Sequence, residues 1–561
     1  MDFFLKAINL MAPAKTAADL PWSEGLQGMD DLSAIESAAQ QLNKDFHSNR
    51  FCDEAHVLAL LAIDDKIHTK VKTITTHFMQ IDNLSMSLEE RMVEAVFLYH
   101  RQIFLIYLAL AEAPVRFKQS SLLLARAINS ATQMIKWRYY NYQTAPANVW
   151  LQLSRLYKLG ADQGVINDNV QAYTDQPAIT LASAYIQACM LGSLENLSLK
   201  CQQIEFVSQM LSIWSSNLVV ENNYNESQHL FYIDTASNTP ARRVNSLVNN
   251  PEQLTSNCYW NFDSVNSKVE LCISLIEFNI DPRQPAIQAL LNNKNALATL
   301  QILRQAWSGA VDKNLHRKEA RSKFSQAANT AYGFKAICMQ ALHYEKLQLE
   351  HGKAPYQGPK TLDERLATHY LANAKTEAGS LKLKITASNT DIIDASTKGV
   401  GLHASQQAHA VSLGMLLGIV VAGSKHATKI GILRNIKSIP GNELRLGVEL
   451  LSSTAVYVSA EKMDAPLVTM PESFSASTYD DAPSFSYTDF GSDPSNFTCL
   501  HLAADPFKSI AETLVIPRQQ YSKKFVYKVN INGTDTLIKF TKSLEWHEDW
   551  VRVIYSNVND D

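Results

Sequence analysis

The chain has 561 residues, of which 46% are hydrophobic and 19% are charged, and its formal net charge is −4. A chain of this length and composition is expected to fold into about two to four domains with large cores, which excludes an intrinsically disordered protein. The net negative charge argues against general nucleic-acid binding, which requires a strongly basic surface.

Cysteine usage and hydropathy indicate the compartment. The seven cysteines are dispersed without a Cys-x-x-Cys pair or metal-ligand spacing, which is typical of reduced thiols in a cytoplasm. The N-terminal Met-Asp-Phe-Phe-Leu-Lys carries an acid where a signal peptide carries basic residues, and the apolar runs 103–111 and 413–422 are shorter than a membrane span. We expect a cytoplasmic protein with no membrane span and no metal site.

The N-terminal part is expected to be helical. Residues 1–30 are interpreted as a leader, and residues 31–216 as an all-α scaffold, because their apolar residues recur with helical spacing. Ser87-Leu-Glu-Glu90 predicts a capping box for a long buried helix that ends at Ala113, before Pro114. Further helices are expected over residues 119–141, 148–159 and 178–216.

The composition then changes twice. Residues 217–310 are rich in Asn, Ser and Thr and are interpreted as a β insert followed by helices. The expected strands are Leu230–Asp234 and Cys258–Phe262, and the expected helices are 265–278 and 292–307. Residues 461–512 are rich in Ser, Asp and Pro and predict an acidic linker.

Strand-like alternation dominates residues 311–460, which predict an antiparallel β-barrel whose first strand is 330–342 and which carries an insertion at about 345–380. Two alternating runs around Pro440-Gly-Asn-Glu443 predict a hairpin. A small C-terminal β unit is expected over residues 513–561. Its hairpin turns at Asn532-Gly533, and its final strand is 545–555.

Two short motifs suggest a binding site. Asp394-Ala-Ser396-Thr-Lys-Gly399 combines a carboxylate, a hydroxyl and a glycine, and Arg317 and Arg321 are spaced by one helical turn. Arginine forks match phosphate oxygens and the O6/N7 edge of guanine, whereas a carboxylate accepts from base N–H groups. Each motif alone also has an interpretation without a ligand. The arginine pair could be a solvated charge cluster, and the Asp-x-Ser-x-x-Gly run could be an ordinary turn.

Taken together, these residues resemble the PilZ domain, a bacterial receptor module for cyclic di-GMP. The run Gly447-Val-Glu449-Leu is similar to the last strand of that barrel. The whole chain also resembles large betaproteobacterial proteins that are described as cyclic-di-GMP-binding, most clearly over Ser87–Pro114, Trp307–Arg321, Ile393–Leu402 and Ile430–Leu451. The resemblance implies that Arg317, Arg321, Asp394, Ser396 and Gly399 bind cyclic di-GMP.

One departure from that family is large, because Arg321 and Asp394 are separated by 73 positions. An insertion over 345–380 would account for this separation. In the competing interpretation, residues 317–323 are the tail of the preceding helix and the barrel lacks its phosphate clamp.

Two functions therefore stay open. The first is a cyclic di-GMP receptor that switches the orientation of the helical scaffold relative to the barrel and so regulates an unknown protein partner through the helical region. The alternative is a binding-deficient PilZ-like scaffold that acts only through protein–protein contacts. An enzyme is not expected, because the sequence contains no phosphate-binding loop, no His-Glu-x-x-His and no nucleophile–base set. No catalytic residue and no cofactor is therefore assigned. His100 is expected to be a satisfied core residue.

Overall fold

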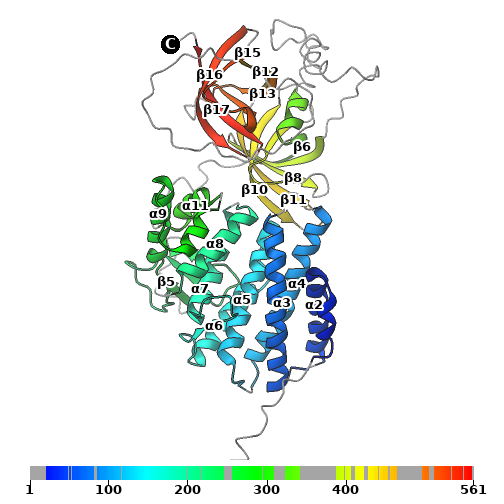
Figure 1. The fold of residues 1–561 in the computed structure, drawn as a ribbon, viewed down its shortest axis with the longest axis vertical. Coiled ribbons are helices and arrows are strands. Elements are labelled where there is room, and N and C mark those ends of the chain that lie inside the picture. Colours follow the sequence, from blue (N-terminus) through cyan, green and yellow to red (C-terminus); the bar gives the residue numbers. More distant parts are fainter. Residues whose placement is uncertain are drawn as a thin grey trace, which may run out of the picture. The chain divides into compact units, whose positions relative to one another are not determined.

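The computed structural model divides the chain into two compact units, Met1–Arg317 and Lys318–Asp561. Each unit is described by itself (Figure 1). The structure describes residues 20–558 except for 49, 52, 81–84, 115, 198, 217, 245–255, 294, 309–321, 342–386, 397, 406–410, 422–427, 440, 442, 453–454, 464–495, 505–510, 532–533 and 548.

The first unit is mainly helical, as predicted. Its α-helices are α2 (Asp31–His47), α3 (Glu54–Gln80), α4 (Met86–Ala111), α5 (Ser120–Tyr140), α6 (Val149–Asp162), α7 (Leu181–Gly192), α8 (Cys201–Trp214), α9 (Asp263–Glu277), α10 (Pro285–Leu291) and α11 (Ala296–Trp307). Its short strands are β1 (Asn169–Val170), β2 (Ile179–Thr180), β3 (Phe231–Asp234), β4 (Arg242–Arg243) and β5 (Asn257–Trp260).

Side-chain caps fix several helix starts. The Asp30 carboxylate accepts from the backbone N–H of Ser33 at 2.9 Å at the start of α2, and this bond is the main reason that the pKa of Asp30 lies below its usual value. Helix α4 is capped by Ser85, whose Oγ accepts from the N–H of Leu88, so the predicted cap at Ser87 is wrong by two residues. A short polar side chain can cap from several positions in this serine-rich stretch, and only the backbone decides which one does.

The predicted helix over 178–216 is two helices. Helix α7 ends at Gly192 and α8 begins at Cys201. The Trp150 ring packs directly on Gly192, where an added Cβ atom would lie 2.4 Å from the ring. Continuous apolar content concealed this break, because helical periodicity continues on both sides of it.

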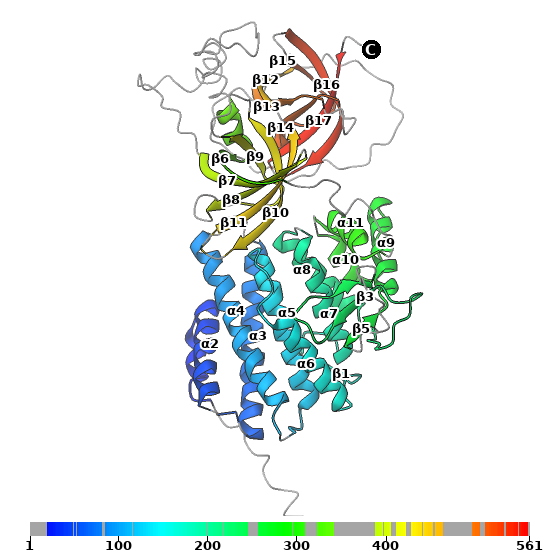
Figure 2. The same ribbon diagram turned by 180° about the vertical axis from the view of Figure 1, so that it is seen from behind.

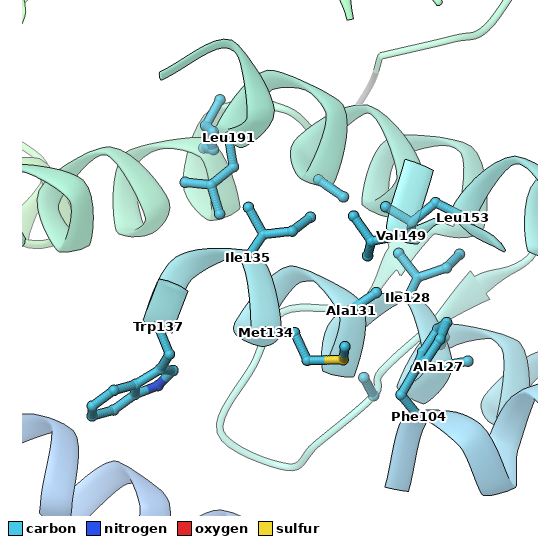
Figure 3. Close-up of a cluster of buried hydrophobic side chains, with 14 of the residues drawn as sticks. Phe104, Ala127, Ile128, Ala131, Met134, Ile135, Trp137, Val149, Leu153 and Leu191 are labelled. Carbon is cyan, nitrogen blue, oxygen red and sulfur yellow. The ribbon is translucent and has the colours of Figure 1, made fainter. Parts of the chain in front are cut away.

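Helix α5 is the centre of the helical core. Ile128, Ala131 and Ile135 are fully buried, and Figure 3 shows them facing Val149 and Leu153 of α6. Burying one isoleucine side chain contributes about 1.5–3 kcal/mol, so this stripe stabilises the unit.

A buried polar cluster joins α3 to three other elements. The Asp64 carboxylate is fully buried and accepts hydrogen bonds from the hydroxyls of Tyr99, Tyr107 and Tyr173 at 2.5–2.9 Å. The Arg126 guanidinium donates to the same carboxylate at 3.1 Å. Burial and the negative charge of Asp64 raise the pKa of Tyr99 well above its usual value. Because every charge and hydroxyl here has a partner, the cluster fixes how α3, α4 and α5 pack.

Helix α4 is the one described helix whose length and composition would suffice to cross a membrane, over Ser87–Ala111. In its most apolar stretch, 72% of the residues are buried inside the helical unit. Buried core helices meet the same criterion, and α4 contacts α2 and α5 along its length.

The second unit contains two closed six-stranded antiparallel barrels. The first barrel has the strand order β10-β11-β8-β7-β6-β9, and the second has the order β12-β13-β14-β17-β16-β15. The strands of the first barrel are β6 (Ser322–Tyr332), β7 (Ala387–Ser396), β8 (Gly399–Ser405), β9 (Leu416–Val421), β10 (Lys429–Ile439) and β11 (Glu443–Ser452). The strands of the second barrel are β12 (Ala455–Met463), β13 (Asn496–Leu502), β14 (Thr513–Pro517), β15 (Val526–Ile531), β16 (Thr534–Trp546) and β17 (Trp550–Asn557).

Both predicted hairpins are confirmed. Strands β10 and β11 pair antiparallel around Gly441, whose positive φ of 96° is the conformation that glycine adopts without a steric cost. Strands β15 and β16 pair on either side of Asn532-Gly533.

The predicted first strand, the predicted linker and the predicted start of the C-terminal β unit need correction. The predicted first strand 330–342 is wrong, because β6 covers 322–332 and residues 334–341 are helical. Strand β13 lies inside the predicted linker 461–512, so the C-terminal β unit is a complete barrel that begins at Ala455. These strands pair with partners far along the chain, which composition alone does not reveal. The predicted insertion 345–380 lies outside the described residues.

Helical residues 334–341 give the two barrels a shared core. Phe334 and Ile337 are buried together with Leu416 of the first barrel and with Tyr457 and Trp550 of the second. This short amphipathic helix packs its apolar side chains against both barrels, which explains why a helix interrupts the strand pattern.

Candidate binding site on the first barrel

The Asp394 side chain lies on the outer face of the first barrel because of a β-bulge. Ile392 pairs with Leu402 and Asp394 pairs with Gly401, so the register shifts between Ile392 and Asp394. Leu402 is fully buried inside the barrel, and its neighbour Gly401 therefore faces outward. The extra residue in β7 turns the Asp394 carboxylate to this outer face, where a regular strand would have pointed it inward.

Glycines on the next two strands make room for that carboxylate. Gly401 on β8 pairs with Asp394 on β7 and with Gly447 on β11. A Cβ atom at Gly401 would lie 2.6 Å from Asp394 Oδ1, which is closer than real contacts allow. The carboxylate therefore lies across the β8 backbone, over a strip with no side chains.

Arg445 of β11 reaches across this strip. Its Nη2 donates to Asp394 Oδ2 at 3.1 Å. The Asp394 side chain is 8% exposed, whereas that of Arg445 is 50% exposed, so the arginine partly covers the acid and still faces solvent. The sequence reasoning missed Arg445. The alternation in Leu444-Arg-Leu-Gly447 was the available signal, because it places Arg445 and Gly447 on one face.

Ser396 and Gly399 form the two ends of the β7–β8 turn. They are Cα partners, and Ser396 Oγ donates to the Gly399 carbonyl at 3.4 Å. The Lys398 carbonyl accepts from the N–H of Leu450 at 2.9 Å, which ties the turn to β11. The structure thus brings Asp394, Ser396 and Gly399 together on one hairpin.

Arg317 and Arg321 lie outside the described residues. The residue after Arg321 is Ser322, the first residue of β6, which pairs with Ala395. Its neighbour Lys323 pairs with Asp394. Antiparallel partners are separated by about 4.5–5.5 Å between Cα atoms, so the start of β6 lies directly beside the acid.

Two further side chains of kinds that can contact a ligand have different surroundings. His403 is half-buried on β8, between its Cα partners Asp391 and Arg445. Trp307 is 1% exposed in the helical core, and its Nε1 donates to Ser193 Oγ at 3.0 Å. Trp307 therefore has a packing role.

The Gly447-Val-Glu449 run also forms an ion pair. Arg434 Nε donates to Glu449 at 2.9 Å, and Arg434 Nη2 donates to Glu545 on β16 at 3.3 Å. Arg434 thereby links Glu449 of the first barrel to Glu545 of the second.

Among the described residues, no group of three or more His, Cys, Asp or Glu side chains could hold a metal ion. The candidate site instead offers an acid, a hydroxyl and an exposed guanidinium on the surface of a barrel. This set suits a polar or anionic ligand that lies on the barrel's outer face.

Fold and site together define a class of protein in which a helical unit is joined to a pair of β-barrels, one of which carries a polar surface site. Residues 18–225 match a family described as "Cyclic-di-GMP receptor FimW, N-terminal domain". A curated relative, the "Cyclic-di-GMP receptor FimW" of Pseudomonas aeruginosa, is 23% identical over 308 residues, covering 52% of this chain and 47% of the relative. The match thus spans about half the length of that relative. No solved structure matches the chain.

Proposed function

We propose that this chain is a receptor for cyclic di-GMP, and not an enzyme. Its nucleotide site would be formed by Arg317, Arg321, Asp394, Ser396 and Gly399 on a PilZ-like first barrel. The observation that carries the proposal is the register of β6 on β7. Ser322 pairs with Ala395, so Arg321 is one peptide bond away from a residue beside the Asp394 turn, although 73 positions separate the two in sequence. The relative's name adds independent support from the helical unit.

The proposed contacts follow from the ligand's chemistry. Cyclic di-GMP carries two phosphate charges and two guanines with O6 and N7 acceptors. Arg317 and Arg321 would fork onto these acceptors or the phosphates, and the Asp394 carboxylate would accept from a guanine N–H. The ion pair of Asp394 with Arg445 would open or widen to admit the base, and Arg445 would then face the ligand's negative charge.

The arginines also suggest how binding would be communicated. They belong to the segment between Trp307 of the helical unit and Ser322 of the first barrel. A ligand that holds both arginines against the barrel would constrain the segment that links the two units. We propose that this changes the orientation of the helical unit and so regulates a protein partner that binds it, in a cytoplasmic location.

Isothermal titration calorimetry of the full chain with cyclic di-GMP tests the proposal. The double variant Arg317→Ala/Arg321→Ala is expected to lower affinity by at least about thirtyfold, since each fork contributes about 1–3 kcal/mol. A matched control is Arg155→Ala/Arg304→Ala, which removes two arginines whose surface ion pairs lie in the helical unit. Linear di-GMP and cyclic di-AMP serve as ligand controls.

The outcomes separate the two candidate functions. Unchanged affinity in the Arg317/Arg321 double variant refutes the proposed site. No heat of binding for the unmodified chain favours the alternative of a binding-deficient scaffold that acts only through protein–protein contacts. The register of β6 supports the receptor, because it brings the residue after Arg321 beside Asp394 despite the long separation of the two motifs in sequence.

A further inference from the structure

The helical unit contains a cavity of about 350 Å³ that the proposed nucleotide site does not use. Its wall comes from α3, α4, α5, α7 and α8 and from the residues around β1 and β2. Figure 2 shows α5 between α3 and α7, in agreement with the residues that line the cavity. A volume of this size lies at the lower end of the range for small-molecule sites.

Polar atoms without a partner face this cavity from three different helices. Both ring nitrogens of His100, Oδ1 of Asn129 and Nε2 of Gln187 are buried and have no hydrogen-bond partner within the described part of the chain. His100 is only 2% exposed, which confirms that it is a core residue, but the expectation that its ring is satisfied is wrong, because neither nitrogen has a partner there. Leaving a buried polar group unpaired costs about 1–3 kcal/mol, and three such side chains around one cavity would be a large cost without a function.

The charged groups of the cavity, in contrast, are paired with one another. Lys136 Nζ lies 2.9 Å from Glu205 Oε2. Asp175 contacts both His68, at 3.0 Å, and Lys72, at 2.8 Å. Burial, the largest single influence, would raise the pKa of Glu205, but the charge of Lys136 together with hydrogen bonds from Tyr140, Lys136 and Gln209 outweighs it, and the pKa lies below its usual value. The ionic part of the wall is therefore balanced before any ligand enters.

His100 contributes a neutral ring. Burial, together with the nearby charges of His68 and Lys136, lowers its pKa to about 3. A neutral imidazole has one donor and one acceptor nitrogen. Asn129 Oδ1 adds an acceptor and Gln187 Nε2 adds a donor, so the unpaired set offers donors and acceptors in equal measure.

We propose that this cavity is a second ligand site, which takes a small uncharged molecule that carries both hydrogen-bond donors and acceptors. Such a molecule satisfies the unpaired atoms of His100, Asn129 and Gln187 without adding a net charge. A charged ligand would have to break the pair of Lys136 with Glu205 or remain uncompensated inside the unit, and either event is costly. Ala184 and Ile128 are among the apolar residues of the wall.

Saturation-transfer NMR on the full chain tests this proposal with nicotinamide and uracil as neutral probes and with benzoate and benzylammonium as charged ones. At least one neutral probe is expected to bind, and both charged probes are not. Asn129→Leu and Gln187→Leu each remove one partner atom at similar volume, and each is expected to weaken binding by up to about tenfold. Gln305→Leu, an exposed change on α11, is the matched control.

A steric variant keeps the test decisive. Ala184→Phe projects a ring into the cavity, leaves all three polar side chains in place and is expected to abolish probe binding. Thermal unfolding, monitored by circular dichroism, verifies that each variant is folded. Probe binding is compared only among the variants that fold. The proposal is overturned if neither neutral probe binds, if binding is the same in all folded cavity variants, or if a charged probe binds as well as the neutral ones.

Discussion

The Asp394 carboxylate on β7 lies over the backbone of Gly401 on β8, at a position where any other residue would displace it. A Cβ atom at Gly401 would lie within 2.6 Å of Oδ1 and 2.9 Å of Oδ2 of that carboxylate. The geometry of the candidate site therefore depends on a glycine outside the Asp-x-Ser-x-x-Gly motif. The β-bulge at Ile393 and the glycine act together, because one turns the acid outward and the other lets it lie flat.

Gly401→Ala is expected to weaken cyclic di-GMP binding at least tenfold, because the new methyl group pushes Asp394 away from Arg445. Overpacking of this kind also costs about 1–3 kcal/mol of stability. Calorimetry and urea unfolding measure the two effects. Gly28→Ala, where nothing lies within 4 Å of the added Cβ atom, is the control. Unaltered affinity would show that the position of Asp394 is not important for binding.

Arg445→Gln is expected to lower affinity for cyclic di-GMP by several-fold and to change stability little. The half-exposed ion pair with Asp394 contributes only about 0–1 kcal/mol to folding, but the arginine's charge faces an anionic ligand. Titrations at low and high salt measure the effect, which should shrink as salt screens the charge. Tighter binding by the variant would mean that Arg445 competes with the ligand for Asp394.

Asp64→Ala is expected to destabilise the helical unit by about 3–5 kcal/mol, because it leaves the buried Arg126 and three tyrosine hydroxyls without their shared acceptor. Asp65 also pairs with Arg126, at 2.6 Å, but its side chain is 50% exposed. Asp65→Ala is therefore the matched control and should cost about 1 kcal/mol or less. Urea unfolding of both variants is the measurement, and equal losses would contradict the role of the cluster.

Acid is expected to destabilise the helical unit through His100. The pKa of this residue is about 3 in the folded chain and 6.5 as its ordinary value, so between these two values the unfolded chain binds more protons. Stability is therefore complete above pH 6.5 and falls, as the pH is lowered toward 3, by up to about 1.4 kcal/mol per pH unit.

His100→Phe is expected to flatten this dependence, which unfolding curves at a series of pH values would measure. His77→Phe, at an exposed position on α3, is the control and should leave the dependence as it is. A slope that persists in His100→Phe would assign the acid sensitivity to other groups.

Local patterns in the sequence predicted much of the fold. Helical periodicity identified α4, α5 and α6 to within a few residues, and turn residues identified the hairpins around Gly441 and Asn532-Gly533. Helical periodicity and turn type depend on residues that are close together in the sequence, so both can be predicted from the sequence directly. The break after Gly192 and the strand β13 were missed, because tertiary packing decides both.

The sequence by itself determined that a helical part precedes a β part, and that an acid, a hydroxyl and a glycine share one turn at 394–399. Only the tertiary structure decided that Asp394 faces outward, that Arg445 covers it, and that β6 begins beside it. The physical reason is that strand register and bulges are fixed by pairing between segments that are far apart in the sequence. The entropic cost of closing the loop between such segments grows only slowly with its length, so a strand can pair with a distant partner. The cavity beside His100 likewise exists only once five helices have packed around it.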